Sequence, residues 1–252
     1  MIEAQNLKKI YENGTIALDG ISFHIEKGNI CGYVGTNGAG KSTTVKILCG
    51  ILTFNEGNVI INGLDIKKYN FEIKKIIGYV PESPFFFNSI TVEEHFEFLG
   101  KIRNLDSNLL KRRLSYFTEF FDFSDYLNLA IGQLSKGNKQ KVLITSALLH
   151  NPDILLFDEP LNGLDATAIL RFKDMVKKLA HHNKTILYSS HLLNVIEQLA
   201  SHIIIIDKGK IVLDKPTELL LKSPEYTNLD NLFKDYTTEF EEKEFQYEEV
   251  FD

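Results

Sequence analysis

The chain has 252 residues, of which 44% are hydrophobic and 25% are charged, so it is long enough to bury a core as one domain or two small ones. This composition excludes a collagen, a wholly disordered chain and a disulfide-rich miniprotein. The longest aliphatic run, 203–206, is far shorter than the roughly 20 apolar residues that span a bilayer. The first ten residues lack the apolar stretch of a signal peptide, and two cysteines fit a reducing cytosol. We therefore expect a chain that is neither exported nor itself membrane-spanning.

The formal net charge of −6 is concentrated at the C-terminal end of the chain. From Tyr236 onward there are seven acidic residues and one basic residue, so residues 1–235 are neutral. A neutral body does not favour nucleic acid, for which a basic face is expected. The acidic tail also carries aromatic and apolar residues among its glutamates. A solvated end is the default interpretation of this tail, and docking on a partner or on the neighbouring subunit is the alternative.

The first third of the chain contains two kinds of β-rich segment. Alternating runs at 16–25 and 59–66, the latter crossed by an Asn62-Gly63 turn signal, predict an antiparallel patch. Runs at 29–34 and 76–80 are more continuously apolar, which is typical of buried strands.

The middle of the chain, from about 86 to 134, is mainly helical in pattern. Thr91 and Glu94 have the spacing of a capping box at a helix start. One apolar stripe follows at helical spacing: Leu110, Leu114, Phe117 and Phe121. These features predict a helical insertion.

Strand and helix signals then alternate. Helical periodicity at 172–180 and 192–200 separates apolar β-rich runs at 154–157, 185–188 and 202–206. Lys208-Gly209-Lys210 marks a hairpin after the last of these runs. Alternation of this kind predicts an α/β fold with a parallel sheet at its core.

Residues 35–42 read Gly-Thr-Asn-Gly-Ala-Gly-Lys-Ser and match the phosphate-binding loop G-x-x-x-x-G-K-[ST] between a predicted strand and a helix. Glycines allow a tight turn whose backbone N–H groups point at phosphate oxygens, and the following helix adds its positive end. Lys41 is expected to reach the β and γ phosphates, and the Ser42 hydroxyl to bind Mg²⁺.

A pair of carboxylates, Asp158 and Glu159, ends the apolar run that begins at Ile154. Strand ends of a parallel sheet open toward the ligand crevice. Asp158 there can hold Mg²⁺, and Glu159 can polarise a water beyond the γ-phosphate. Alone, such a pair is often an ordinary strand terminus.

Three further motifs accompany these two. They are Leu-Ser-Lys-Gly-Asn-Lys-Gln at 134–140, Gly-Leu-Asp at 163–165 and Ser-Ser-His at 189–191. With these motifs in this order, the chain resembles the nucleotide-binding subunit of ATP-binding cassette (ABC) transporters over about residues 1–220.

The resemblance implies a P-loop NTPase fold with a mixed sheet core, an antiparallel β subdomain and a helical subdomain at about 86–149. Residues 221–252 would form a C-terminal extension with the acidic tail. It also implies a head-to-tail dimer, of two copies of this chain or of this chain with a second ABC subunit, which closes on two ATP molecules.

The resemblance assigns roles to individual residues. Tyr11 would stack on adenine, His191 would contact the γ-phosphate, and Asp165 would couple the two sites. Ser135 and Gly137 would bind the nucleotide held by the opposite subunit. The phosphates would be wrapped by Gly35, Asn37, Gly38, Ala39, Gly40, Lys41, Ser42 and Thr43. Simpler alternatives remain for Tyr11, as a surface strand aromatic, and for His191, as a helix-capping or core histidine.

Two positions depart from the family's common pattern. Glu82 stands where glutamine is usual, and an ionised glutamate only accepts hydrogen bonds. We expect Glu82 to act with the catalytic residues Glu159 and His191 and to contact Mg²⁺ with Ser42 and Asp158. The segment 134–140 corresponds to the family's signature, commonly Leu-Ser-Gly-Gly-Gln, from which Lys136 and Asn138 depart. Both departures resemble the export-type branches that include bacitracin-resistance and lantibiotic-immunity subunits.

The resemblance predicts an ATP-hydrolysing subunit, cytoplasmic and peripheral on the inner face of the membrane, that powers a separate permease for export of a drug, peptide or lipid-like substrate. The aromatic segment 84–87 lies where the family receives its permease, although it could instead fill the core. The main alternative is a soluble ABC ATPase acting on ribosomes or DNA. An ATP-binding regulatory subunit is a third alternative, which the intact Glu159 disfavours.

Overall fold

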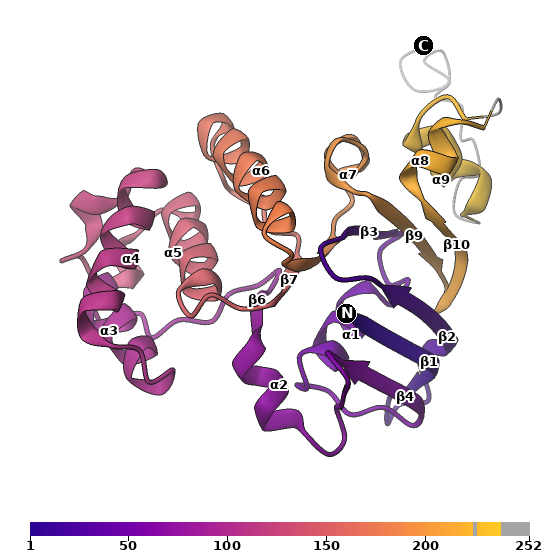
Figure 1. Ribbon diagram of the computed structural model, residues 1–252, viewed down its shortest axis with the longest axis horizontal. Coiled ribbons are helices and arrows are strands. Elements are labelled where there is room, and N and C mark those ends of the chain that lie inside the picture. The colour runs from indigo at the N-terminus through magenta and orange to yellow at the C-terminus, as the bar shows by residue number, and fades with distance from the viewer. Residues whose placement is uncertain (224–225, 238–252) are drawn as a thin grey trace, which may run out of the picture.

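A computed structural model describes residues 1–223 and 226–237 of the chain (Figure 1). Its centre is a 6-stranded sheet in the order β10-β9-β3-β8-β7-β6, within the described residues. Strands β3, β6, β7, β8 and β9 run parallel to their neighbours, and β10 pairs antiparallel with β9. Their bounds are β3 Ile30–Gly35, β6 Ile77–Val80, β7 Ile154–Asp158, β8 Thr185–Ser189, β9 His202–Asp207 and β10 Lys210–Pro216. The predicted parallel core is therefore confirmed.

A second sheet is antiparallel and has the order β2-β1-β4-β5. It comprises β1 (Ile2–Ile10), β2 (Ile16–Ile25), β4 (Glu56–Ile61) and β5 (Leu64–Asp65). The predicted antiparallel patch and its Asn62-Gly63 turn are confirmed, since both turn residues have positive φ, 47° and 81°. Strand β1 was not expected from the sequence.

Helices cover both faces of the central sheet because successive strand side chains point to opposite sides. In β7, Leu155 and Phe157 join the core beneath the helices that lie between residues 92 and 199. Ile154 and Leu156 point the other way, into the core shared with α1 and the antiparallel sheet. The helices involved are α1 (Lys41–Leu48), α2 (Asn70–Ile76), α6 (Ala166–His181) and α7 (Leu193–Leu199).

The helices α3 (Val92–Ile102), α4 (Ser107–Phe120) and α5 (Lys136–Leu148) form a group beside the sheet (Figure 1). The capping box is confirmed, since Glu94 N donates to Thr91 Oγ1 at 3.1 Å and Thr91 N donates to Glu94 Oε2 at 2.8 Å. Leu114 and Phe121 of the predicted stripe are buried, while Leu110 and Phe117 are half-buried. Two short 3₁₀ turns, Ser124–Tyr126 and Ile131–Gln133, connect α4 to α5.

The predicted hairpin joins β9 to β10 at Lys208 and Gly209, which have φ values of 45° and 77°. Two short helices follow, α8 (Thr217–Leu221) and α9 (Leu229–Tyr236). Leu229 is fully buried in the core beneath α7. The acidic tail from residue 238 lies outside the described residues. No helix in the part of the chain that the structure describes is long and apolar enough to cross a bilayer.

Candidate nucleotide-binding site

The phosphate-binding loop leaves β3 at Gly35 and enters α1 at Lys41. Gly38 and Gly40 have φ values of 80° and 113°, in the left-handed region that favours glycine. A Cβ at Gly40 would lie 2.6 Å from the Ala17 carbonyl oxygen, so the loop requires a glycine there. The loop therefore presents its backbone at the N-terminus of α1, as the motif predicts.

Lys41 is buried and lies over its own loop. Its Nζ donates to the carbonyl oxygens of Gly35 at 2.7 Å and Thr36 at 2.9 Å. These contacts hold a positive charge inside the turn that follows β3. The charge complements the anion that such a turn is built to bind.

Asp158 ends β7 and is 1% exposed. Its Oδ1 atom is buried and has no hydrogen-bond partner among the described residues. Burial raises the pKa of this carboxyl, and the nearby Ser42 hydroxyl opposes that shift by favouring the charged form. Unpaired carboxylate and hydroxyl oxygens are ligands that suit Mg²⁺. Within the described ranges, no group of three or more His, Cys, Asp and Glu side chains forms a metal site by itself.

Glu159 follows in a left-handed backbone conformation, with φ 49°. Its backbone N–H donates to the Ser189 carbonyl oxygen at 2.9 Å, which fixes the turn to the end of β8. The carboxylate receives three donors: Ser190 Oγ at 2.9 Å, and the backbone N and Nδ1 of His191, both at 2.8 Å. Because a carboxylate only accepts, Nδ1 of His191 carries a proton in this pair. The carboxylate is thereby held at one orientation.

Most of the expected residues meet in one cleft of about 570 Å³. Tyr11 is 37% exposed there, and its hydroxyl lies 3.1 Å from Thr43 Oγ1. Glu82 enters from the exposed loop after β6. The expected residues that line this cleft are Tyr11, Asn37, Gly38, Gly40, Lys41, Ser42, Thr43, Glu82, Asp158, Glu159 and His191. Gly35 and Ala39 belong to the same loop but lie beneath its surface.

His191 is neither a core histidine nor a helix cap. Its side chain is 60% exposed and pairs with Glu159. It lies two residues before the first residue of α7, whose N-cap is Leu192.

The signature residues lie elsewhere on the chain. Ser135 is the N-cap of α5 and accepts from Asn138 N at 3.2 Å, while its own surface is exposed. A Cβ at Gly137 would lie 2.6 Å from the Gly163 carbonyl oxygen, so the two segments touch through backbone. Neither Ser135 nor Gly137 lines the cleft.

Asp165 caps α6 by accepting from Ala168 N at 2.8 Å, and it pairs with Lys141 of α5 at 3.3 Å. The Ala168 N–H, followed by Lys141, lowers the pKa of this carboxyl. Asp165 therefore joins α6 to the signature helix and also lies outside the cleft.

Two contacts were not expected from the sequence. Ser190 Oγ accepts from Leu192 N at 3.1 Å, so its single proton is directed to Glu159. Gln140, 3% exposed, donates from Nε2 to the Pro160 carbonyl oxygen at 2.8 Å and so ties the signature helix to the residue after Glu159. Both residues occur in motifs, but motif spacing alone does not show which atoms they touch.

Comparison with known proteins gives a consistent result. A family model described as "ABC transporter" matches residues 18–162. The chain is 34% identical to the ABC transporter ATP-binding protein NatA of Bacillus subtilis over 91% of this chain and 92% of that protein. It is 34% identical to the bacitracin transport ATP-binding protein BcrA of Bacillus licheniformis, covering 88% of this chain and 72% of that protein.

Solved structures agree with this result. The structure of an ATP-binding subunit of an ABC transporter superposes with a TM-score of 0.88 at 27% identity, covering 94% of this chain and 99% of that one. A dimeric ATP-binding cassette in a post-hydrolysis state, bound to ADP and Pi, superposes with a TM-score of 0.80 at 25% identity, covering 86% and 99%.

Proposed function

Because the chain belongs to the ABC transporter ATP-binding family, we propose that it is the ATP-hydrolysing subunit that drives a separate transmembrane permease. The observation that supports this most strongly is the cleft. Residues from five separate stretches of the chain, around positions 11–17, 37–43, 82, 158–159 and 191, line this one space. The cleft combines a phosphate-binding turn, the unpaired Oδ1 of Asp158, and Glu159, whose carboxylate is fixed by hydrogen bonds. This combination suits phosphoryl transfer to water.

The phosphates of ATP bind over the turn that precedes α1. Backbone N–H groups of the loop and the positive end of α1 face the phosphate oxygens, and Lys41 adds its ammonium charge. Tyr11 lies at the cleft rim with its ring exposed, where it can stack on the adenine. Positioning and charge neutralisation provide most of the catalysis in this reaction class.

Glu159 orients and polarises the attacking water. Its carboxylate is fixed by Ser190 and His191, so it offers a lone pair in a defined direction. His191, with its side chain largely exposed in the cleft, contacts the γ-phosphate once nucleotide binds. Ser42, Asp158 and Glu82 are the oxygen donors that would hold Mg²⁺. When bound, this ion neutralises charge that develops on the phosphates.

Two chains are needed to complete the site. The exposed Ser135 and the half-buried Gly137 lie at the start of α5 and outside their own chain's cleft. A helix N-terminus with a serine hydroxyl and a close-packed glycine suits a phosphate that a second subunit presents. Asp165 links this surface to α6 and so to the segment after Glu159. ATP then acts as the bridge between subunits, and its hydrolysis releases them.

The permease docks beside α3 on a surface that is largely apolar and also carries Lys74, Lys75 and Arg103. A groove of about 930 Å³ lies between α2 and α3, and its lining includes Ile51, Phe71, Leu99 and Ile102. The aromatic segment 84–87 lies nearby: Phe85 is 86% exposed, and Phe87 contacts Phe98 of α3 edge to face. Phe86 instead packs on the core, so the segment is divided between core and surface.

The cargo is proposed to be a peptide, drug or lipid-like molecule that is moved outward. The names of relatives support this, since they include bacitracin transport proteins and a linearmycin resistance protein of Bacillus subtilis. Glu82, in place of the usual glutamine, agrees with that branch. The chain would then lie at the cytoplasmic face of the membrane, held there by its permease.

Measurement of ATP turnover tests the proposed ATP-hydrolysing activity. Purified protein should hydrolyse Mg-ATP, and Glu159→Gln should lower the rate by at least about 100-fold because it removes the group that polarises water. Glu119→Gln provides the matched control: it makes the same chemical change on the exposed surface of α4 and should leave the rate unchanged. Equal rates for Glu159→Gln and wild type would contradict the proposal.

Copurification with a coexpressed permease tests whether the chain binds its permease through this surface. Replacing Phe85 and Phe87 with serine should remove most of the protein that copurifies with its coexpressed permease in membranes, because the apolar contact is lost. Leu170→Ser, at an apolar residue of α6 that is 66% exposed, is the matched control. If both variants remain on membranes equally well, the permease docks elsewhere.

A further inference from the structure

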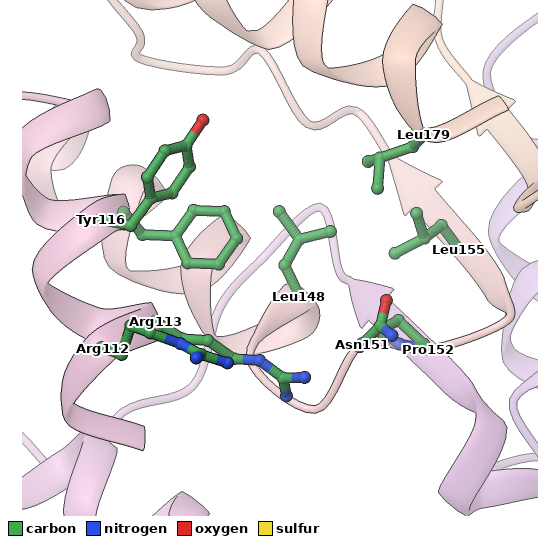
Figure 2. Close-up of a pocket in the computed structure, with 9 residues that line it drawn as sticks. Arg112, Arg113, Tyr116, Leu148, Asn151, Pro152, Leu155 and Leu179 are labelled. Carbon is green, nitrogen blue, oxygen red and sulfur yellow. The ribbon is translucent and has the colours of Figure 1, made fainter. Parts of the chain in front are cut away.

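A second pocket, of about 460 Å³, lies between α4 and α6, away from the nucleotide cleft (Figure 2). Figure 2 shows Tyr116 on the α4 side of this space, with Leu148 below it and Leu155 and Leu179 across from it. The remaining lining residues are Arg112, Arg113, Phe117, Asn151 and Pro152. None of them lines the cleft or belongs to the signature. The pocket is thus apolar inside, with two guanidinium groups at one wall.

The charge at this pocket is positive. None of the ion pairs within residues 1–223 and 226–237 involves Arg112 or Arg113. Arg113 donates to the Leu149 carbonyl oxygen at 2.7 Å, which fixes its guanidinium at the wall. On the other side, the last turn of α6 carries His181 and Lys178, of which Lys178 pairs with Asp174 at 2.7 Å. A ligand that is both acidic and aromatic would complement this pocket.

We propose that residues 238–252 of this same chain bind in the pocket between α4 and α6. This segment holds all seven acidic residues of the C-terminal tail against a single base, Lys243. Among the acids stand four aromatic residues, Phe240, Phe245, Tyr247 and Phe251. Carboxylates would pair with the guanidinium groups of α4, and a ring would fill the apolar interior.

Residues 238–252 are long enough to reach from the end of α9 to the pocket. Helices α9, α7 and α6 form a row on one side of the sheet, and α5 and then α4 lie beyond α6 (Figure 1). Lys173 of α6 donates to Gln198 of α7, and α9 contacts α7. At about 8–10 Å between packed helices, the pocket is roughly 30 Å from the end of α9. At about 3.3 Å per residue, residues 238–252 extend to roughly 50 Å, and Tyr247 stands near the 30 Å mark.

Tethering favours this occupant over a free ligand. A segment joined to α9 has an effective concentration at the pocket of about a millimolar, so a weak contact suffices. The tail would also pass the exposed Lys177 of α6, beside which Lys178 pairs with Asp174. Because the pocket's walls come from both α4 and α6, the bound tail ties the α3–α5 group to the sheet core.

Photo-crosslinking of the full-length protein tests this inference. Tyr247 is replaced by p-benzoylphenylalanine, and the crosslinked peptide is identified by mass spectrometry. We expect crosslinks within one chain to residues 110–120 of α4 or 176–182 of α6. Crosslinks to other regions, crosslinks only between two chains, or no crosslinks would overturn the proposal.

Two double variants show whether the pocket's own chemistry is responsible. Arg112→Glu with Tyr116→Ala should lower the crosslink yield about fivefold or more, since it removes an attractive charge and an exposed ring. Lys75→Glu with Phe71→Ala makes the same changes at a cation and an exposed ring of α2, where Lys75 Nζ lies 4.5 Å from the Phe71 ring centroid. This control should change the yield by less than about twofold. An equal loss in both variants would overturn the proposal, which does not depend on ATP turnover or on a permease.

Discussion

Ser190→Ala removes one buried hydroxyl and tests how the carboxylate of Glu159, proposed to polarise the attacking water, is held in place. Ser190 is 1% exposed, and its Oγ joins Leu192 N at 3.1 Å to Glu159 Oε2 at 2.9 Å. A hydrogen bond to a charged group contributes about 1.5–3 kcal/mol. The lost acceptor for Leu192 N–H costs about 1 kcal/mol more, as for a helix cap. We therefore expect a free energy of unfolding lower by about 2–4 kcal/mol.

The same change should slow hydrolysis. Ser190 does not line the cleft, so the KM for ATP should stay within about twofold of wild type. If about 1.4 kcal/mol of the positioning is lost from the transition state, kcat falls about tenfold. Steady-state ATP turnover and urea denaturation measure the two effects. Ser190→Thr keeps the hydroxyl and should recover at least part of kcat.

Ser201→Ala separates this role from simple destabilisation. Ser201 Oγ also accepts a backbone N–H, from Ile30 at 3.1 Å, but it is remote from the cleft. This variant should lose stability and keep its kcat. If Ser190→Ala keeps wild-type kcat, or if Ser201→Ala loses as much activity, Ser190 does not position Glu159.

Three other changes follow from buried polar contacts and charge. Gln140→Ala breaks the bond to Pro160 and should lower the free energy of unfolding by about 1–3 kcal/mol, measured by urea denaturation. Glu82→Gln removes a negative charge that helps raise the pKa of Asp158, so permease-stimulated turnover should change by more than ATP affinity does; unchanged basal and permease-stimulated turnover would contradict this. Burial lowers the pKa of His95 and His150 to about 4, below the unfolded value of about 6.5, so the urea midpoint should fall as pH drops from about 6.5 to 4, and less steeply in His150→Gln.

The buried strands were predictable because their apolar runs are continuous. Residues 154–157 and 203–206 have no polar interruption, as expected for strands covered on both faces. Strand β1 was missed because its alternation fails: Asn6 has φ 49°, and the register with β2 shifts between Ala4 and Leu7. A bulge of this kind breaks the period of two on which prediction relies. Helix α2 was missed because it buries only Ile73.

The site residues were predictable where a motif is local in sequence. Lys41 and Ser42 follow the glycine turn directly, and Asp158 and Glu159 end one strand. The Ser190 and Gln140 contacts join segments that are distant in the chain, 31 and 20 residues apart. Which donor meets which acceptor there depends on strand register and helix rotation, so a single sequence does not specify it. The division at residue 220 stays a prediction.

Gel filtration of Glu159→Gln with and without ATP tests the central claim most directly. This claim is that Ser135 and Gly137 of a second chain complete the ATP-binding site in the first chain's cleft. The variant keeps the phosphate-binding loop and lacks the group that polarises water, so ATP should persist and hold two chains together. The account predicts a dimer in ATP, a monomer without it, and a monomer in both conditions when Ser135→Arg is added. A monomer in saturating ATP, for a variant shown to bind ATP, would contradict the account.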